Sequence, residues 1–190
     1  MKSADGDPEL AVALAALVSR RTRSVAASVI DIETESRTRF AFIGADPDTR
    51  FEIGSVTKGL TGMLLADAVD RGETLLATNV SDISPRYEGT TFGTVTMKEL
   101  CTHTSGLPRV GWSPLGSARA LSNVLLAHDP YRGQSSSELL DVAARQPIRH
   151  RGQPRYSNLG AAVLGHLVAT KAGVDYPSLL RERGSCFRQE

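Results

Sequence analysis

Ser55 and Lys58 stand three residues apart at the start of a predicted helix, within FEIGSVTKGLTGMLLADAVDRGE, residues 51–73. Side chains at positions i and i+3 of a helix lie on one face, within contact of each other. A serine hydroxyl becomes a nucleophile when a base takes its proton, and a lysine amine serves where burial and cations lower its pKa. Free backbone N–H groups at a helix N-terminus also point toward an oxyanion on an attacked carbonyl. The pair therefore indicates a nucleophile, a proton acceptor and part of an oxyanion hole.

The S-x-x-K spacing is weak by itself, because a serine that caps a helix and a lysine in solvent give the same pattern. The rest of the helix strengthens the catalytic interpretation, since it contains Gly59 and Gly62, each costing about 1 kcal/mol relative to alanine in a helix interior. Glycines in a buried helix favour close backbone approach, so we expect Lys58 to be covered rather than solvated. The large apolar residues of this helix are Leu60, Met63, Leu64, Leu65 and Val69.

Three stretches together resemble one known family. Residues 51–73 resemble the nucleophile helix of serine β-lactamases and penicillin-binding proteins, for which S-x-x-K is the known signature. LCTHTSGLPR, residues 100–109, resembles the L-x-T-H-T-S-G-L-P loop of class C-type β-lactamases, D,D-peptidases and related serine esterases. PRYSNLGAAVLG, residues 154–165, resembles their Y-x-N segment and the small-residue helix after it. The resemblance covers about residues 8–183 and does not separate β-lactamase, D,D-peptidase and esterase.

The resemblance implies a role for four residues. Ser55 would be the acylated nucleophile, and Lys58 would share its proton network. Tyr156 would be the acid/base partner, with a phenol pKa lowered by nearby cations. Asn158 would hydrogen-bond the substrate amide and hold Lys58 in place. Without the motif, Tyr156 would be interpreted as a half-buried core tyrosine.

Two histidines, His103 and His166, were considered as metal ligands. His103 stands at a structural position of the matching loop, and His166 is predicted to pack in the core among Ala162, Val163 and Leu167. No second ligand lies at a useful spacing from either histidine, so we expect no metal site and no cofactor.

The sequence also departs from the family. Members carry a third motif downstream of Y-x-N, a lysine or histidine followed by Thr or Ser and Gly, which supplies the second oxyanion N–H. The only candidate, Lys171-Ala172-Gly173, lies at a helix end and lacks the hydroxyl. After SLLRER, residues 178–183, the tail 184–190 has no family counterpart. We therefore expect a C-terminally truncated member, and two interpretations stay open: a serine hydrolase, or an inactive homologue that is at most a binding module.

The implied fold class is α+β with β-lactamase/transpeptidase-like architecture. Residues 1–54 would hold an N-terminal helix and a β-hairpin, residues 55–183 a large helical region with the active-site motifs, and the C-terminal sheet strands would be missing. The predicted helices span about residues 8–20, 55–72, 135–147, 157–173 and 174–183. A short helix is predicted within 95–109, a helical turn near 121–126 and a loop over 74–94. The hairpin strands are predicted at 24–33 and 37–45, and an open edge of a two-stranded sheet invites self-association.

Composition limits the other classes of function. Of the 190 residues, 41% are hydrophobic and 23% charged, and 22 basic against 21 acidic residues give a net charge of +1, so no field favours nucleic acid. The substrate is expected to be a small molecule or a peptide.

The apolar run at residues 10–18 is too short to span a bilayer and follows an acidic segment rather than the basic start of a signal peptide. The chain as given is therefore expected to be cytoplasmic, although family members are often periplasmic or secreted. Cys101 and Cys186 form no disulfide framework, and Cys101 is predicted to be a small core residue.

Overall fold

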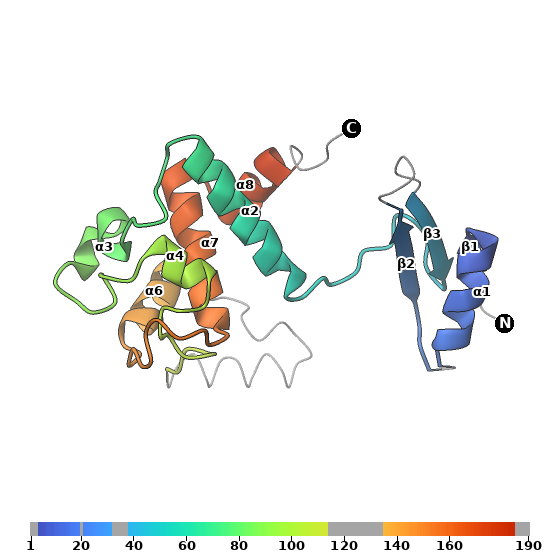
Figure 1. Ribbon diagram of the computed structural model, residues 1–190, viewed down its shortest axis with the longest axis horizontal. Coiled ribbons are helices and arrows are strands. Elements are labelled where there is room, and N and C mark those ends of the chain that lie inside the picture. Colours follow the sequence, from blue (N-terminus) through green and yellow to red (C-terminus); the bar gives the residue numbers. More distant parts are fainter. Residues whose placement is uncertain (1–3, 20, 32–37, 114–134, 185–190) are drawn as a thin grey trace. The chain divides into compact units, whose positions relative to one another are not determined.

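The computed structural model describes residues 4–19, 21–31, 38–113 and 135–184 (Figure 1). The chain forms two compact units, residues 1–53 and residues 54–190. We call them the N-terminal unit and the helical unit, and each is described by itself.

The N-terminal unit is a small antiparallel sheet with one helix on it. Its elements are β1 (Ala4–Gly6), α1 (Pro8–Leu17), β2 (Val25–Ile30) and β3 (Thr38–Ile43), and the strand order is β1-β3-β2. Asp7 caps α1 by accepting a hydrogen bond from the Leu10 N–H, and Pro8 takes the first helical position. The buried side chains between helix and sheet are Ala11, Leu14, Ala41 and Ile43.

Strand β1 was not predicted from the sequence. Its three residues contain no β-branched or aromatic side chain, which are the usual strand signals. Gly6 has a φ of +97°, and a Cβ at this position would collide with the Phe40 carbonyl. The next residue, Asp7, donates its N–H to that same carbonyl at 2.8 Å. The described sheet therefore has three strands rather than two, and α1 ends at Leu17 rather than near Arg20.

One face of this sheet carries exposed apolar side chains. Phe40 and Phe42 on β3 stack with ring centroids 6.4 Å apart, and Phe40 is 50% exposed. Ile30 at the end of β2 is also exposed. Because β2 lies at the edge of the described sheet, self-association through this edge stays a prediction.

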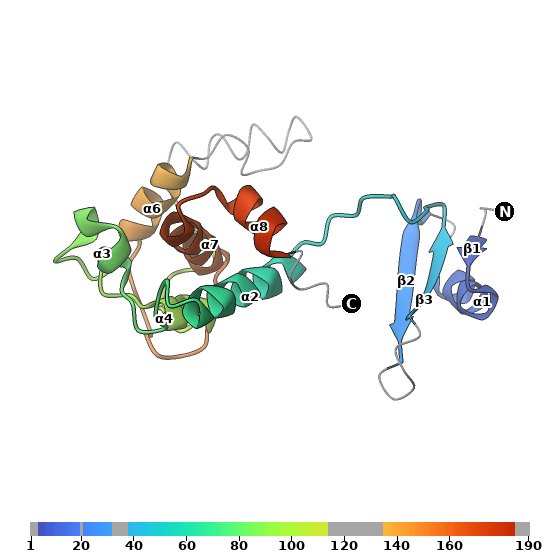
Figure 2. The ribbon, with the colours of Figure 1, turned by 90° about the horizontal axis from the view of Figure 1, so that it is seen from above.

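The helical unit is built around α7. Its helices are α2 (Val56–Asp70), α3 (Val80–Ile83), α4 (Met97–Cys101), α6 (Ser136–Ala144), α7 (Asn158–Ala172) and α8 (Tyr176–Gly184), with the 3₁₀ helix η1 (Pro85–Tyr87) after α3. Helix α7 packs against α2, α4, α6 and α8, as both ribbon views show (Figure 1, Figure 2). Fully buried side chains at this junction include Leu64, Leu65, Leu100, Leu167 and Val168.

Local signals explain how α7 begins, packs and ends. Ser157 caps the helix by accepting a hydrogen bond from the Gly160 N–H at 2.8 Å, and Gly173 closes it in the left-handed conformation. At Gly165 an added Cβ would lie 3.1 Å from the Tyr176 ring, so the glycine lets α8 approach closely. The Tyr176 hydroxyl also hydrogen-bonds the Thr61 hydroxyl on α2 at 2.7 Å.

The predicted loop at residues 74–94 contains two short helices. Asn79 and Asp82 form a capping box at the start of α3, and Pro85 opens η1. These elements are only three or four residues long, too short for a hydrophobic period to show in the sequence. The predicted helical turn near residues 121–126 and residues 185–190 of the tail lie outside the described residues.

One further prediction about burial is wrong, and a second finds no support within the helical unit. Cys101 is exposed rather than a core residue. Among the described residues, no atom lies within 4 Å of a Cβ built on Gly59, and the Cβ of Gly62 would meet only the Cys101 Sγ, at 3.8 Å. Within the helical unit, these two glycines therefore have no close backbone neighbour. Of the helices that the structure describes, none has the length and apolar character to cross a bilayer.

Candidate active site

Three predicted site residues converge in the helical unit. The Ser55 Oγ lies 2.7 Å from the Tyr156 hydroxyl, although the two residues are 101 positions apart. The Lys58 Nζ donates to the same Oγ at 3.2 Å and lies 5.1 Å from the centroid of the Tyr156 ring. One hydroxyl thus contacts an amine and a phenol at once, which is the contact set required to remove its proton.

Ser55 does not serve as a helix cap. It precedes α2 in the capping position, but its side chain makes no capping hydrogen bond and its backbone is already helical, with φ −72° and ψ −7°. The hydroxyl is directed to Lys58 and Tyr156 instead. The interpretation of Ser55 as an ordinary cap is therefore wrong, and α2 begins without the stabilisation of about 1 kcal/mol that a serine cap usually gives.

Lys58 is half-buried, so the expectation of a covered lysine is met only in part. The residue lies one turn into α2, on the side of the helix that faces Tyr156. Its amine points at Ser55 because the i, i+3 spacing places both side chains on one face of the helix.

Tyr156 is 44% exposed, so it is not a core tyrosine. The pKa of its phenol is lowered, chiefly by the hydrogen-bonding proximity of the Lys58 amine and then by the hydrogen bond with Ser55. The positive charges of Lys58 and Arg109 lower this pKa further, whereas desolvation opposes them. A phenol in this setting loses its proton more readily. The resulting phenolate can accept a proton from the Ser55 hydroxyl.

The segment that carries Tyr156 is fixed by the loop that carries His103. The Ser157 Oγ donates to the Pro108 carbonyl at 2.7 Å, which anchors the residue next to Tyr156. Backbone N–H groups of the later segment donate to carbonyls of the earlier one: Arg149 to Gly106, Gly152 to Thr104, Arg155 to His103 and Asn158 to Arg109, at 2.8 to 3.0 Å. Tyr156 is therefore positioned by a ladder between two loops.

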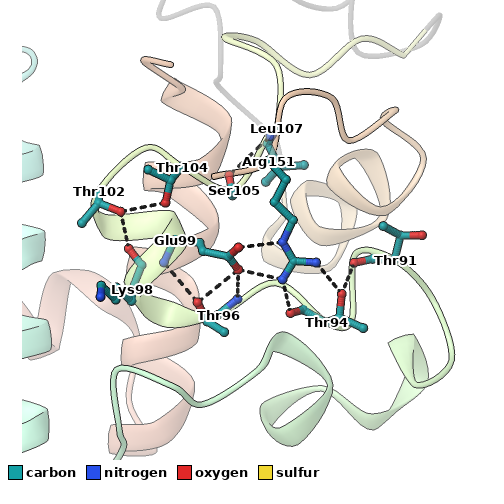
Figure 3. Close-up of polar contacts among 10 residues, drawn as sticks. All are labelled: Thr91, Thr94, Thr96, Lys98, Glu99, Thr102, Thr104, Ser105, Leu107 and Arg151. Carbon is teal, nitrogen blue, oxygen red and sulfur yellow. Dashed lines mark hydrogen bonds and ion pairs between the residues drawn. The ribbon is translucent and has the colours of Figure 1, made fainter. Parts of the chain in front are cut away.

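A charged cluster lies beside this ladder, at Arg151 (Figure 3). The Arg151 guanidinium donates from Nε and Nη2 to the two oxygens of Glu99, at 2.6 and 2.8 Å. It also donates to the side chain and the carbonyl of Thr94, at 2.8 and 2.6 Å. Glu99 in turn accepts the N–H of Thr96 in the capping box of α4. The pair joins the Tyr156 segment to the start of α4.

Replacement of Glu99 by glutamine is expected to lower the free energy of unfolding at neutral pH by about 1.5–3 kcal/mol, because charge-assisted hydrogen bonds are lost. Arg151 is the largest cause that lowers the pKa of Glu99 in the folded chain. The stabilisation is therefore full above the unfolded pKa, about 4.3, and is lost as the pH falls through the folded pKa. Urea unfolding of wild type and Glu99→Gln at pH 7 measures the full contribution of the pair to the free energy of unfolding. The same measurement at successively lower pH below 4 follows its loss.

The matched control for this experiment is Glu88→Gln, which removes the same charge at an exposed position. Its free energy of unfolding is expected to stay within about 0.5 kcal/mol of the wild type. A Glu99→Gln variant that loses as little stability at pH 7 as this control would show that the Arg151 pair contributes nothing.

Asn158 lies beside the cluster but does not make the predicted contact. Its backbone N–H donates to the Arg109 carbonyl at 2.9 Å, and its side chain is half-buried. Within the described part of the chain, no hydrogen bond joins its side-chain amide to Lys58. Lys58 instead donates a hydrogen bond to Ser55. The predicted role of Asn158 in holding the lysine is therefore not supported by a hydrogen bond between the two side chains.

The two histidines differ in their surroundings. The His103 Nδ1 accepts the Ser157 N–H at 3.2 Å, and its ring lies 4.9 Å from the Tyr156 ring. Burial and the Lys58 charge lower the pKa of His103, which keeps it neutral and in a supporting position. His166 is half-buried rather than packed in the core, and burial lowers its pKa. Among the residues with described positions, no group of three His, Cys, Asp or Glu side chains could hold a metal ion.

Arg109 belongs to this surrounding and was not predicted to do so. Its guanidinium carbon lies 5.7 Å from the centroid of the Tyr156 ring, so the phenol has a second cation nearby. The sequence offered one signal, because Arg109 closes the motif loop directly after Gly-Leu-Pro. No spacing rule could connect it with a tyrosine 47 residues later.

Comparison with known proteins decides the family. The family model described as Beta-lactamase matches residues 10–183. The chain belongs to the beta-lactamase family. This agrees with the resemblance of the three motif stretches, and the Ser55, Lys58 and Tyr156 cluster of this beta-lactamase family member lies within the matched range.

Its relatives carry two kinds of name. The chain is 29% identical over 144 residues to Penicillin-binding protein 4 of Amycolatopsis lactamdurans, covering 74% of this chain and 35% of that protein. It is also 29% identical over 138 residues to a Beta-lactamase of Escherichia coli (strain K12), covering 71% of this chain and 32% of that protein. The chain thus spans about one third of the length of the curated relatives it matches.

The fold prediction is confirmed by a solved structure. The class C beta lactamase from Rhodobacter sphaeroides matches with a TM-score of 0.65 at 24% identity. The match covers 84% of this chain and 42% of that chain. The mixed α and β architecture of this family member is therefore of the β-lactamase/transpeptidase type.

Proposed function

We propose that the helical unit carries the acylation centre of a serine hydrolase of the β-lactamase/penicillin-binding type. The carrying observation is that the Ser55 Oγ contacts both the Tyr156 hydroxyl, at 2.7 Å, and the Lys58 amine, at 3.2 Å. The names of the matched relatives support this reaction class. The substrate is an amide or ester carbonyl, such as a β-lactam, a D-alanyl peptide or a small ester.

Acylation follows from the contacts of Ser55. Tyr156, as phenolate, accepts the proton of the Ser55 hydroxyl while the oxygen attacks the carbonyl carbon, and the Lys58 ammonium offsets the negative charge. The N–H groups of Thr57 and Lys58 are already bonded to the Gly54 and Ser55 carbonyls, so we assign the oxyanion to the N–H groups that precede them at the start of α2. Collapse of this intermediate breaks the bond to the amine or alcohol, which takes the proton from Tyr156 and leaves an ester on Ser55.

Deacylation uses the same groups in reverse. Tyr156 takes a proton from a water molecule, the hydroxide attacks the ester, and Ser55 recovers its proton from Tyr156. We assign the Asn158 side chain to the amide of the substrate, because it lies at the start of α7, two residues after Tyr156.

A second candidate is a homologue that binds such ligands without turnover. It is favoured by the exposure of the cluster, since Ser55 is exposed and Tyr156 is 44% exposed. In open solvent, charges are screened and contribute less to a transition state than in a closed site. The two candidates differ in whether a covalent bond to Ser55 forms.

The deciding experiment is covalent labelling. Incubation with a fluorescent penicillin or a fluorophosphonate is expected to label the chain once, with the label mapped to Ser55 by mass spectrometry. Ser55→Ala is expected to abolish labelling, and Ser135→Ala, which removes an exposed cap serine on α6, is expected to leave it intact. Labelling that persists in Ser55→Ala refutes the proposal, and a folded chain that never labels supports the binding module.

A further inference from the structure

The loop of residues 102–109 places a cation near the ring of the proposed base. The Arg109 guanidinium carbon lies 5.7 Å from the Tyr156 ring centroid, within the distance of about 6 Å at which a cation is attracted to an aromatic ring. The Lys58 Nζ lies 5.1 Å from the same centroid. The phenol of Tyr156 therefore has two cations close to it, one from α2 and one from the loop.

The backbone of Arg109 is anchored at this place. Its carbonyl accepts the N–H groups of Asn158, at 2.9 Å, and Leu159, at 3.4 Å, and the preceding carbonyl of Pro108 accepts the Ser157 hydroxyl at 2.7 Å. These contacts fix the start of the Arg109 side chain next to the residue that follows Tyr156. The approach of the guanidinium to the ring is thus a consequence of how the loop joins α7.

Among the described residues, the guanidinium of Arg109 has no carboxylate partner. Arg151 and Arg183, by contrast, each pair with acidic side chains. The other titratable group that faces the phenol from the same loop is His103, whose low pKa keeps it neutral. Lys58 and Arg109 are therefore the charges that act on Tyr156.

We propose that Arg109 is a positioning residue that acts through Tyr156, as the second cation that stabilises its phenolate. Lys58 contacts Ser55 directly, so its charge serves the nucleophile and the base together. The 5.7 Å distance joins Arg109 to the Tyr156 ring and no hydrogen bond, among the described residues, joins it to Ser55 or Lys58, so its charge is assigned to the phenol. Its consequence for turnover rests on the proposed hydrolase function, but the ionisation of Tyr156 does not.

The test is a titration without substrate. Ultraviolet absorbance follows tyrosinate formation with pH, and subtraction of the Tyr156→Phe curve isolates Tyr156 from the other three tyrosines. Arg109→Gln is expected to move the Tyr156 midpoint to higher pH, and Arg109→Lys is expected to stay close to the wild type. Arg155→Gln removes an equal charge from the exposed neighbour of Tyr156 and is expected to leave the midpoint unchanged.

Salt separates a charge effect from a structural one. The difference between wild type and Arg109→Gln is expected to shrink from about 0.01 M to about 1 M salt, as the Debye length falls from about 30 to about 3 Å. An unchanged midpoint in Arg109→Gln overturns the proposal, and so does an equal shift in Arg155→Gln or a shift that salt does not reduce. Ser55 labelling tests the hydrolase function separately, so failure of one experiment does not decide the other.

Discussion

Replacement of Tyr156 by phenylalanine is expected to slow acylation of Ser55 by about 10²- to 10⁴-fold, the range that a general acid–base group contributes. The substitution keeps the ring near Lys58 and Arg109 and removes only the oxygen that lies 2.7 Å from the Ser55 Oγ. The nucleophile then has the lysine amine alone as a neighbouring base. The rate constant for labelling by a fluorescent β-lactam, under excess reagent, measures the effect.

Tyr176→Phe is the matched control for this rate. The Tyr176 hydroxyl also lies 2.7 Å from a hydroxyl on α2, that of Thr61, but away from the nucleophile. Its removal is expected to lower stability by about 0.5–1.5 kcal/mol and to leave the acylation rate unchanged. Equal rates for the two Tyr→Phe variants would exclude Tyr156 as the base.

Replacement of Gly106 by alanine is expected to lower the free energy of unfolding by about 2–5 kcal/mol, at the upper end of single substitutions. Gly106 is buried at a φ of +76°, a conformation that costs other residues about 1–2 kcal/mol. An added Cβ would also lie 2.8 Å from the Arg149 carbonyl and 2.9 Å from the Ile148 Cγ2. The Tyr156 segment would have to move away from the loop, so the acylation rate should fall as well.

Gly152→Ala separates the cost of the positive φ from the cost of the steric contacts. Gly152 also has a positive φ, but an added Cβ there would not be crowded. Its φ is +88°, and no described atom lies within 4 Å of an added Cβ. It is expected to show only the conformational cost, and thermal or urea unfolding of both variants gives the difference. If Gly106→Ala is no less stable than Gly152→Ala, the contact between the two loops is not tight.

Local signals in the sequence were sufficient for the longer helices and for two of the site residues. Asp7, Ser135 and Ser157 lie just before α1, α6 and α7, and each accepts a hydrogen bond from a backbone N–H of the first turn. The i, i+3 spacing placed Ser55 and Lys58 together, because helix geometry fixes that distance. These predictions depend on contacts within a few residues.

Contacts between distant segments could not be predicted in this way. Tyr156 was assigned to the site only through the family resemblance, since no short-range sequence spacing links it to Ser55. Arg109 was missed because its relation to Tyr156 depends on the ladder between two loops. Gly59 and Gly62 have no close backbone neighbour within the helical unit, and the sequence of one helix does not show which surface a glycine faces.

The carbonyl of Arg109 has a consequence for amide hydrogen exchange. The first N–H groups of a helix normally lack partners and exchange quickly with solvent. At the start of α7, this carbonyl accepts the N–H groups of Asn158 and Leu159, and Ser157 accepts that of Gly160. Deuterium uptake at these amides therefore reports each opening of the two loops, and the lifetime of the intact site can be followed without substrate or label.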